Sequence, residues 1–397
     1  MAGMRFLPTA LLLAGATLAQ TPDSGFLKNS SFEEVPALLL SNDKIELTVL
    51  TNGGALANLI LRDDPEKLSP FWNPKRYARE AGRKHSGYGM GHFICVDGFG
   101  PVSPEEKDAG LPGHGEAHTL AWETKSARKE GATGVLTQTV KLPILQEIFT
   151  RTLSLVDGEN VVYARSELES LLGFDRPVNW GEHATIGSPF LEAAVTVVDM
   201  PATRAQTRPD TFSLPGRLAR GADFTWPLAP LADGQKVDVR ASPPTSNTID
   251  HTTCLLDPSR TLVFVTALNP SKRLILGYVF RREDYPWVQS WENYPADMRM
   301  ARGLEFATQP YDVPRRQTVE THRMFDAPTY RWLPAKSKIE SRYLLFYAHA
   351  PEGFRKVDDV RLEGGKLLIE DRQANKRITL NAVLSDQLLA VSQNRAR

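Results

Sequence analysis

The sequence predicts an all-β protein built as one large sandwich-like domain. Many short segments alternate apolar and polar residues, which is the pattern of a half-buried strand. Turn sequences such as Asn-Gly and Asp-Gly separate these segments, and few stretches have the apolar spacing of an amphipathic helix. A chain of 397 residues has room for two or three average domains. However, large β-sandwiches use such a length as one domain, and no strong linker divides this chain.

The N-terminal residues have the pattern of a secretory signal peptide. Arg5 supplies one positive charge before a short run rich in leucine and alanine, and small residues up to Ala19 provide a cleavage site. We therefore expect residues 1–19 to be removed, with cleavage after Ala16 as the alternative. The mature chain is expected to be exported, to the periplasm or the extracellular space. No stretch approaches the roughly 20 apolar residues of a membrane helix, so no membrane span is expected in the mature chain.

The strands can be predicted in order along the chain. The first expected pair is joined by Thr-Asn-Gly-Gly at 51–54 and the second by Asp-Gly-Glu-Asn at 157–160. Such residues are typical of hairpin turns because glycine and asparagine tolerate positive φ. The expected strand pairs are 45–49 with 55–61, 149–155 with 161–168, and 261–268 with 273–280, and a further strand covers 339–348.

The regions between the strands predict three long loops and a C-terminal appendage. Glycine and proline are frequent at 98–113, 201–221 and 243–250, and long ordered loops often carry binding function. We assign residues 20–355 to the large domain. Residues 356–397 are expected to form a small hairpin, within 367–380, followed by a polar tail.

Composition limits the classes of partner. The 47 Lys and Arg residues balance 47 Asp and Glu residues, so the chain lacks the basic surface of a nucleic-acid-binding protein, and no nucleic acid is expected as a partner. The 41% of hydrophobic and 24% of charged residues are typical of a globular protein. The two cysteines, Cys95 and Cys254, are far apart, and the sequence leaves open whether they form a disulfide bond.

Three short segments contain candidate catalytic side chains. In Gly-His-Gly-Glu-Ala-His (113–118), glycines on both sides of His114 allow a tight turn and leave the imidazole accessible. In the second segment, His183 lies just ahead of an apolar turn. The third places Glu305 inside an apolar strand-like run, where burial would raise its pKa and make it a base near neutrality. Glu116 and Glu182 are expected to be solvated or to anchor loops.

A metal site at the first segment is the alternative. His114 and His118 would share one face of a helix, as zinc ligands do. Gly115 and the preceding Pro-Gly disfavour a helix, and no third ligand is evident. We therefore expect no metal.

In this order, the three segments resemble the galactose mutarotase-like superfamily, which contains the aldose 1-epimerases. The hairpin at 52–63 is similar to the start of that family, and Phe-Trp-Asn-Pro at 71–74 resembles its following turn. Trp-Leu-Pro at 332–334, followed by the strand-like run 339–346, is similar to its closing strand. The resemblance implies a β-supersandwich with a sugar-binding cleft across one sheet.

The resemblance also implies roles for three residues. His114 would bind the sugar and polarise it near the ring oxygen, His183 would protonate that oxygen, and Glu305 would take the proton from the anomeric hydroxyl. No cofactor is needed for this chemistry. An aromatic floor is expected because sugar rings have an apolar face, and Trp180 and Trp291 are the candidates since they flank the motifs.

Further contacts and two other functions stay open at this point. His118 stands where many relatives have arginine, and we expect it to contact the ligand. A sugar-binding module without turnover would have the same features as an epimerase. A polysaccharide lyase would need a basic groove for a uronate, for which Arg76 and its basic neighbours between Lys75 and Lys84 are candidates. The leading function is an exported aldose 1-epimerase-like isomerase acting on a sugar or glycan. The identity of the sugar and the oligomeric state are left open.

Overall fold

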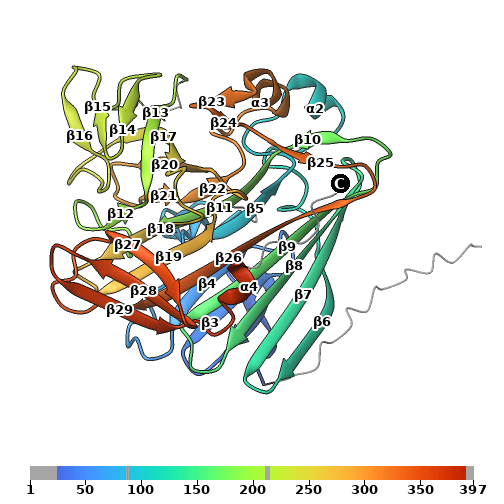
Figure 1. Cartoon of the computed structure of the whole chain (residues 1–397), viewed down its shortest axis with the longest axis horizontal. Helices are drawn as coiled ribbons and strands as arrows, with labels where there is room; N and C mark the ends of the chain where they lie inside the picture. The colour runs from blue at the N-terminus through green and yellow to red at the C-terminus, as the bar shows by residue number, and fades with distance from the viewer. Residues whose placement is uncertain (1–24, 86, 88, 211–214, 390–397) are drawn as a thin grey trace, which may run out of the picture.

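The computed structural model describes residues 25–85, 87, 89–210 and 215–389. The predicted signal peptide and the end of the predicted polar tail lie outside the described residues. Two large antiparallel sheets dominate this part of the chain (Figure 1), and the helices within it are four short segments. The predicted all-β architecture is therefore confirmed.

The first sheet has twelve strands. In spatial order they are β1 (Leu27–Phe32), β2 (Val35–Ser41), β3 (Ile45–Leu50), β4 (Leu56–Leu61), β5 (His92–Val96), β11 (Trp180–Gly187), β21 (Ala301–Gly303), β20 (Trp287–Tyr294), β17 (Thr248–Leu256), β13 (Ala202–Thr207) and β14 (Asp223–Thr225), with β22 (Glu305–Ala307) between β11 and β20.

The second sheet has eight strands. Their order is β12 (Val197–Asp199), β18 (Leu262–Asn269), β19 (Leu274–Arg281), β26 (Lys338–His349), β9 (Val161–Ser170), β8 (Glu147–Val156), β7 (Thr133–Leu142) and β6 (Glu123–Glu130). The predicted pairs β3–β4, β8–β9 and β18–β19 and the predicted strand β26 are all confirmed.

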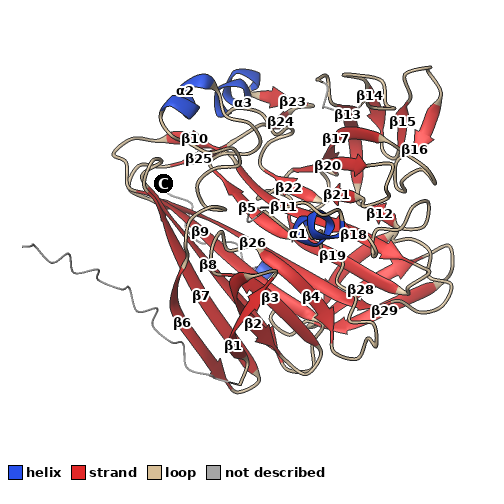
Figure 2. Cartoon of the chain, turned by 180° about the vertical axis from the view of Figure 1, so that it is seen from behind, coloured by secondary structure: helices blue, strands red, loops and turns tan. Residues whose placement is uncertain are grey.

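Smaller strand pairs and short helices lie around the two sheets (Figure 2). They are the strand pairs β10 (Arg176–Val178) with β25 (Arg331–Leu333), β15 (Leu228–Pro230) with β16 (Lys236–Asp238), and β23 (Arg323–Met324) with β24 (Ala327–Pro328), together with the helices α1 (Pro74–Glu80), α2 (Pro104–Asp108), α3 (Arg315–Thr321) and α4 (Asp386–Leu389).

The predicted loop at 201–221 was wrong in its first part, because β13 lies there and pairs with β17. Only Ala205 and Thr207 of this strand are buried, and Arg204 is exposed. Since the strand has no large apolar residue, its alternation carried no apolar signal that sequence reading could detect.

The C-terminal residues form a third sheet. The hairpin predicted within 367–380 is confirmed as β28 (Lys366–Asp371) with β29 (Lys376–Asn381), and β27 (Asp359–Glu363) adds one more strand. Leu367 and Ile369 of this sheet pack with Phe264 and Phe346 of the eight-stranded sheet. The appendage therefore covers the outer face of that sheet.

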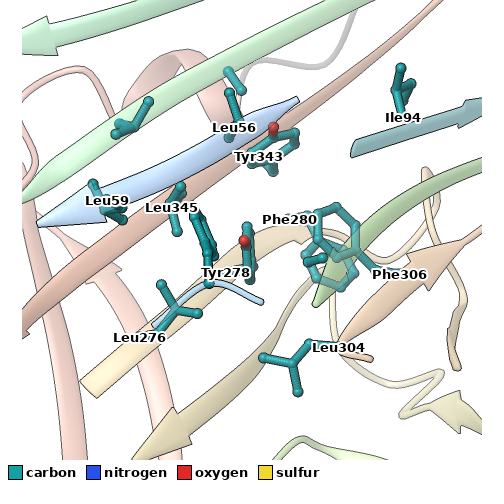
Figure 3. Packing of buried hydrophobic residues seen from close by; sticks show 14 of the residues in the cluster. Leu56, Leu59, Ile94, Leu276, Tyr278, Phe280, Leu304, Phe306, Tyr343 and Leu345 are labelled. Atoms are coloured by element: carbon teal, nitrogen blue, oxygen red, sulfur yellow. The ribbon is translucent and has the colours of Figure 1, made fainter. Parts of the chain in front are cut away.

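The main core lies between the two large sheets, and Phe306 of β22 is at its aromatic centre (Figure 3). Its ring stacks on Phe280 with 4.4 Å between the ring centroids. It also makes edge contacts with Tyr285 at 5.1 Å and Tyr343 at 5.4 Å. The strand that carries Glu305 is thus fixed by the contact between the sheets.

A buried polar network lies beside this aromatic cluster and centres on Glu182. Its carboxylate is 2.8 Å from Nε2 of His92 and accepts hydrogen bonds from Nε1 of Trp180 (3.2 Å) and the hydroxyl of Tyr285 (3.1 Å). Glu182 is fully buried, so the expectation that it is solvated or anchors a loop was wrong. Each oxygen of the Glu182 side chain has a partner, as burial of a polar group requires.

Both cysteines are free and buried, Cys95 on β5 and Cys254 on β17. The question left open by the sequence is answered, since no disulfide bond joins them. None of the helices in the described part of the chain is long and apolar enough to cross a membrane.

Replacing Phe306 by alanine should lower the free energy of unfolding by about 3–5 kcal/mol, because the substitution empties the centre of the contact between the sheets. Urea denaturation monitored by circular dichroism measures this change. Phe174 is the matched control, since its side chain is 61% exposed and its removal should change stability by less than about 0.5 kcal/mol. Equal effects of the two substitutions would contradict this account of the core.

Candidate active site

Four neighbouring strands of the twelve-stranded sheet bring one row of side chains together. His183 of β11 lies opposite Phe93 of β5. Glu182 of β11 pairs with Phe306 of β22. Because the two strands are antiparallel, the next residue of β11, His183, lies beside Glu305 of β22. Glu305 in turn lies opposite Gln289 of β20. The row Phe93, His183, Glu305, Gln289 therefore crosses the centre of the sheet on one face.

Alternation along β11 decides which of its residues belong to this face. Successive side chains of a strand point to opposite sides of a sheet. Trp180 and Glu182 face the core between the sheets, whereas His183 faces a cavity on the other side. A catalytic candidate and a structural carboxylate are therefore neighbours in sequence but lie on opposite faces.

His183 and Glu305 form a close acid–base pair. Nε2 of His183 lies 3.5 Å from Oε1 of Glu305. The other ring nitrogen, Nδ1, is hydrogen-bonded to Oγ1 of Thr185 at 3.0 Å. The ring stacks on Phe93, with the ring centroids 4.1 Å apart and the planes at 21°. Thr185 and Phe93 thus fix the imidazole so that Nε2 faces the carboxyl group.

Glu305 is held in an unusual environment for a carboxyl group. Its side chain is 2% exposed, and its Oε1 has no hydrogen-bond donor among the described residues. Burial raises the pKa of Glu305 well above its ordinary value, and the positive charge of Arg208 opposes this shift in part. Gly303 makes room for the carboxyl group, since a Cβ at that position would overlap with it.

The loop after β5 brings His114 to the same pair. His114 has a φ of 64°, and its Nδ1 accepts a hydrogen bond from the backbone N–H of Gly100 at 3.2 Å. Its ring lies 5.3 Å from that of His183. Glu116 anchors the loop, because its carboxylate accepts hydrogen bonds from the backbone N–H groups of Ile144 (3.1 Å) and Leu145 (3.0 Å). The loop-anchoring role expected for Glu116 is confirmed.

Burial makes the histidines of this region poor bases. It lowers the pKa of His114 from 6.5 to about 4, and nearby His118 adds to the shift. The pKa values of His183 and His251 are well below the ordinary value for the same reason, and that of His118 is also lowered. Near neutral pH these imidazoles are uncharged, so each offers one donor and one acceptor nitrogen.

These residues line a cavity of about 690 Å³. Trp72 and Trp291 form an aromatic wall, with ring centroids 5.8 Å apart and planes at 75°. The aromatic and polar side chains of its lining are Trp72, His85, Phe93, His114, His118, Thr119, His183, His251, Trp291, Glu305 and Asp312. A cavity with aromatic walls and a few convergent polar groups is the usual form of a small-molecule site.

A second set of polar side chains lies at the same cavity. His251 comes from β17, and Asp312 comes from the segment after β22. Asp312 forms an ion pair with Arg208, and Nδ1 of His251 lies 3.2 Å from Nη1 of Arg208. Sequence reasoning missed Arg208, His251 and Asp312, and it did not assign Trp72 to the aromatic wall. His251 lies in β17 within a run of consecutive polar residues, 250–253, that does not alternate, and no local pattern marks Arg208 or Asp312.

The structure brings together five of the residues singled out from the sequence. His114, His118, His183, Trp291 and Glu305 all line the cavity. His114 and His118 lie on turns and not on a helix, as expected from Gly115, with their rings 5.9 Å apart. No group of three or more His, Cys, Asp or Glu side chains in the described segments is arranged to hold a metal ion.

One predicted ligand contact was wrong in position, and a second residue lies outside the cavity. Trp180 is fully buried in the core, because it stands three residues before His183 on a strand and so faces the other side of the sheet. Arg76 of α1 is not among the residues that line the cavity, and its guanidinium donates a hydrogen bond to the carbonyl oxygen of Ser188.

Comparison with solved structures shows that the chain has the galactose mutarotase-like fold. A galactose mutarotase-like protein of Clostridium acetobutylicum has a TM-score of 0.56 and 13% identity, over 81% of this chain and 98% of that one. A galactose mutarotase related enzyme of Lactobacillus acidophilus has a TM-score of 0.53 and 12% identity, over 82% and 100% of the two chains. A candidate aldose 1-epimerase of Klebsiella pneumoniae has a TM-score of 0.58 and 12% identity, over 81% and 82%. No family model and no curated protein matches the sequence.

Burial of neutral His114 should make stability depend on pH. Because its folded-state pKa of about 4 lies below the ordinary 6.5, the unfolded chain binds more protons between these values. The free energy of unfolding should therefore fall with decreasing pH below about 6.5, and His114 should contribute about 1 kcal/mol per pH unit. Urea denaturation at several pH values between 4.5 and 7.5 should show a shallower dependence for His114→Gln than for the wild type.

His349 provides the control for this prediction, because its side chain is 46% exposed. The variant His349→Gln should follow the wild-type curve. Parallel curves for the wild type and His114→Gln would show that the imidazole is not held neutral by burial.

Proposed function

We propose that the protein is a cofactor-independent carbohydrate isomerase that interconverts the anomers of a reducing sugar. The observation that carries this proposal is the pair His183 and Glu305, with 3.5 Å between Nε2 and Oε1, on the floor of a cavity with a tryptophan wall. The fold shared with galactose mutarotase-like proteins supports a carbohydrate ligand.

The chemistry requires one base and one acid. Interconversion begins when a base removes the proton from O1 while an acid delivers a proton to O5, so that the C1–O5 bond breaks and C1 becomes a carbonyl carbon. Rotation about the C1–C2 bond and reversal of both transfers give the other anomer. In our proposal Glu305 is the base and His183 is the acid. Each positioned proton transfer of this kind is typically worth about 10²–10⁴ in rate.

The protonation state of the pair His183 and Glu305 suits this reaction. Burial disfavours the charged form of both groups, raising the pKa of Glu305 and lowering that of His183. The pair therefore holds one proton between its two macroscopic pKa values, and burial places that proton mostly on Glu305. The reactive form, with Glu305 as base and His183 as acid, arises when the proton passes to Nε2 of His183, which lies 3.5 Å from Oε1 of Glu305. A sugar that contacts both groups can receive this proton at one oxygen and return another from the second oxygen, and the pair is restored after each turnover.

The remaining cavity residues would bind and orient the sugar. The neutral imidazoles of His114 and His118 can exchange hydrogen bonds with hydroxyl groups without introducing a net charge. The tryptophan wall of Trp72 and Trp291 offers an apolar surface to the C–H face of the ring. We propose that catalysis takes place in the periplasm or outside the cell, on the basis of the signal peptide predicted for residues 1–19.

Replacing Glu305 by glutamine should reduce the enzymatic rate of mutarotation about 10²–10⁴-fold, because the amide cannot accept the O1 proton. Polarimetry of freshly dissolved α-glucose, α-galactose and other aldoses measures the rate, and the panel identifies the sugar. Glu283→Gln is the control, since Glu283 is 61% exposed and pairs with Arg281 on the surface. Sugar binding without acceleration by the wild type would contradict the proposed isomerase and favour a binding module.

The rate should also depend on pH in a bell shape. On the acid limb of the profile the pair carries two protons and has no base. On the alkaline limb the pair carries no proton and has no acid. Since burial lowers the pKa of His183 and raises that of Glu305, the plateau should span neutrality. The profile of kcat/KM, corrected for the uncatalysed rate at each pH, tests this. A corrected rate that rises steadily with pH would show that no acid takes part.

A further inference from the structure

We propose that the site accepts the reducing end of an oligosaccharide, and that the second sugar is acidic and lies in a basic groove beyond Trp72. This inference rests on the proposed function, because it takes the pair His183 and Glu305 as the place where the reducing end binds. It adds a second sugar subsite and a charge preference to that function.

The groove continues directly from the cavity. A second hollow of about 330 Å³ shares Trp72 and His85 with it. The other residues that line this hollow come from α1 and the segment after it, and from the end of β20 and the segment after that strand. They are Pro74, Tyr77, Ala78, Arg83, Lys84, Asn293, Pro295, Asp297 and Arg299. Trp72 thus forms a shared wall between a place for the reacting sugar and a place for its neighbour.

Strand β20 shows the direction in which a ligand would run. Gln289, Trp291 and Asn293 alternate onto the same face of the sheet. Gln289 lies opposite Glu305, Trp291 is in the wall of the cavity, and Asn293 is in the groove. Four residues at about 3.3 Å each place the groove about 13 Å from the acid–base pair. This span is longer than one sugar ring, so the groove suits a second residue of the same ligand.

The volume of the combined site supports the same conclusion. Cavities of roughly 300–1,000 Å³ bury most of a drug-sized ligand. The first hollow alone, at about 690 Å³, falls in the upper half of that range. A single pyranose would leave much of it filled with water, whereas a disaccharide would contact both sides of Trp72.

The groove is positively charged. Its lining contains the cations Arg83, Lys84 and Arg299 and one carboxylate, Asp297. Arg299 pairs with Asp297 and with Glu80.

Two of the cations remain available for a ligand. Arg83 and Lys84 line the groove and form no ion pair with any carboxylate that the structure describes, although the charge of Arg83 lowers the pKa of Asp297. A uronate carboxylate on the second sugar would give these two cations a charge-assisted partner.

Binding measurements with a matched ligand series test the inference. Tryptophan fluorescence, which reports on Trp72 and Trp291, would be titrated with glucose, cellobiose, glucuronosyl-glucose of the same linkage, and glucose 6-phosphate, and with the corresponding galactose-ended series. We expect affinity to rise from the monosaccharide to the neutral disaccharide and again, about tenfold, to the acidic disaccharide. The double variant R83Q/K84Q should lose this last step and keep the affinity for the neutral sugars.

The control variant also replaces one lysine and one arginine by glutamine, but on the eight-stranded sheet. Lys125 and Arg128 lie on exposed positions of β6, and K125Q/R128Q should bind the whole series like the wild type. Equal affinity for monosaccharides and acidic disaccharides, or equal affinity for glucose 6-phosphate and the acidic disaccharide, would overturn the second subsite. Tight binding of the acidic disaccharide without mutarotation would uphold the subsite and overturn the proposed isomerase.

Discussion

The pleat of strand β11 is the constraint on which the site and the core both depend. Trp180 and Glu182 point into the space between the sheets, where Glu182 contacts His92 and Tyr285. His183 points into the cavity on the other face. A shift of one residue in the pairing of β11 would bury His183 in the core and expose Glu182 to the cavity. The buried network around Glu182 therefore also fixes the register that places His183 beside Glu305.

Desolvation sets the chemistry of the cavity. The same burial that keeps the imidazoles of His114 and His183 neutral raises the pKa of Glu305. The cavity can thus offer uncharged donors and acceptors to hydroxyl groups, while Glu305 holds a proton more tightly than an exposed carboxyl group does. An exposed carboxylate and an exposed histidine at the same separation would have ordinary pKa values and would be solvated by water instead of by the ligand.

The strands and most of the cavity histidines could be predicted because each is a local signal. Period-two alternation marks β3 and β8, continuous apolar runs mark β18 and β26, and glycines on both sides of His114 mark its turn. The errors have one physical origin, which is that a local pattern does not say which face of a strand a residue occupies or what lies across the fold. Trp180 was assigned to the ligand although its spacing of three from His183 puts it on the opposite face. The ion pair of Arg208 with Asp312 joins residues 104 positions apart, and no segment of sequence carries that information.

The acid–base pair comes from one sheet, yet its surroundings depend on both. The loop that carries His114 begins at Asp97, which pairs with Arg176 and with Arg315 (2.7 Å). Arg176 also pairs with Glu147 at the start of β8 in the second sheet. The carboxylate of Glu116, farther along the same loop, is bound by the turn just before β8. Both ends of the loop are therefore tied to the second sheet, so His114 is positioned before any ligand arrives. Because His114 is already fixed, binding does not cost the conformational entropy of ordering its side chain. A buried polar group contributes most to recognition and catalysis under this condition.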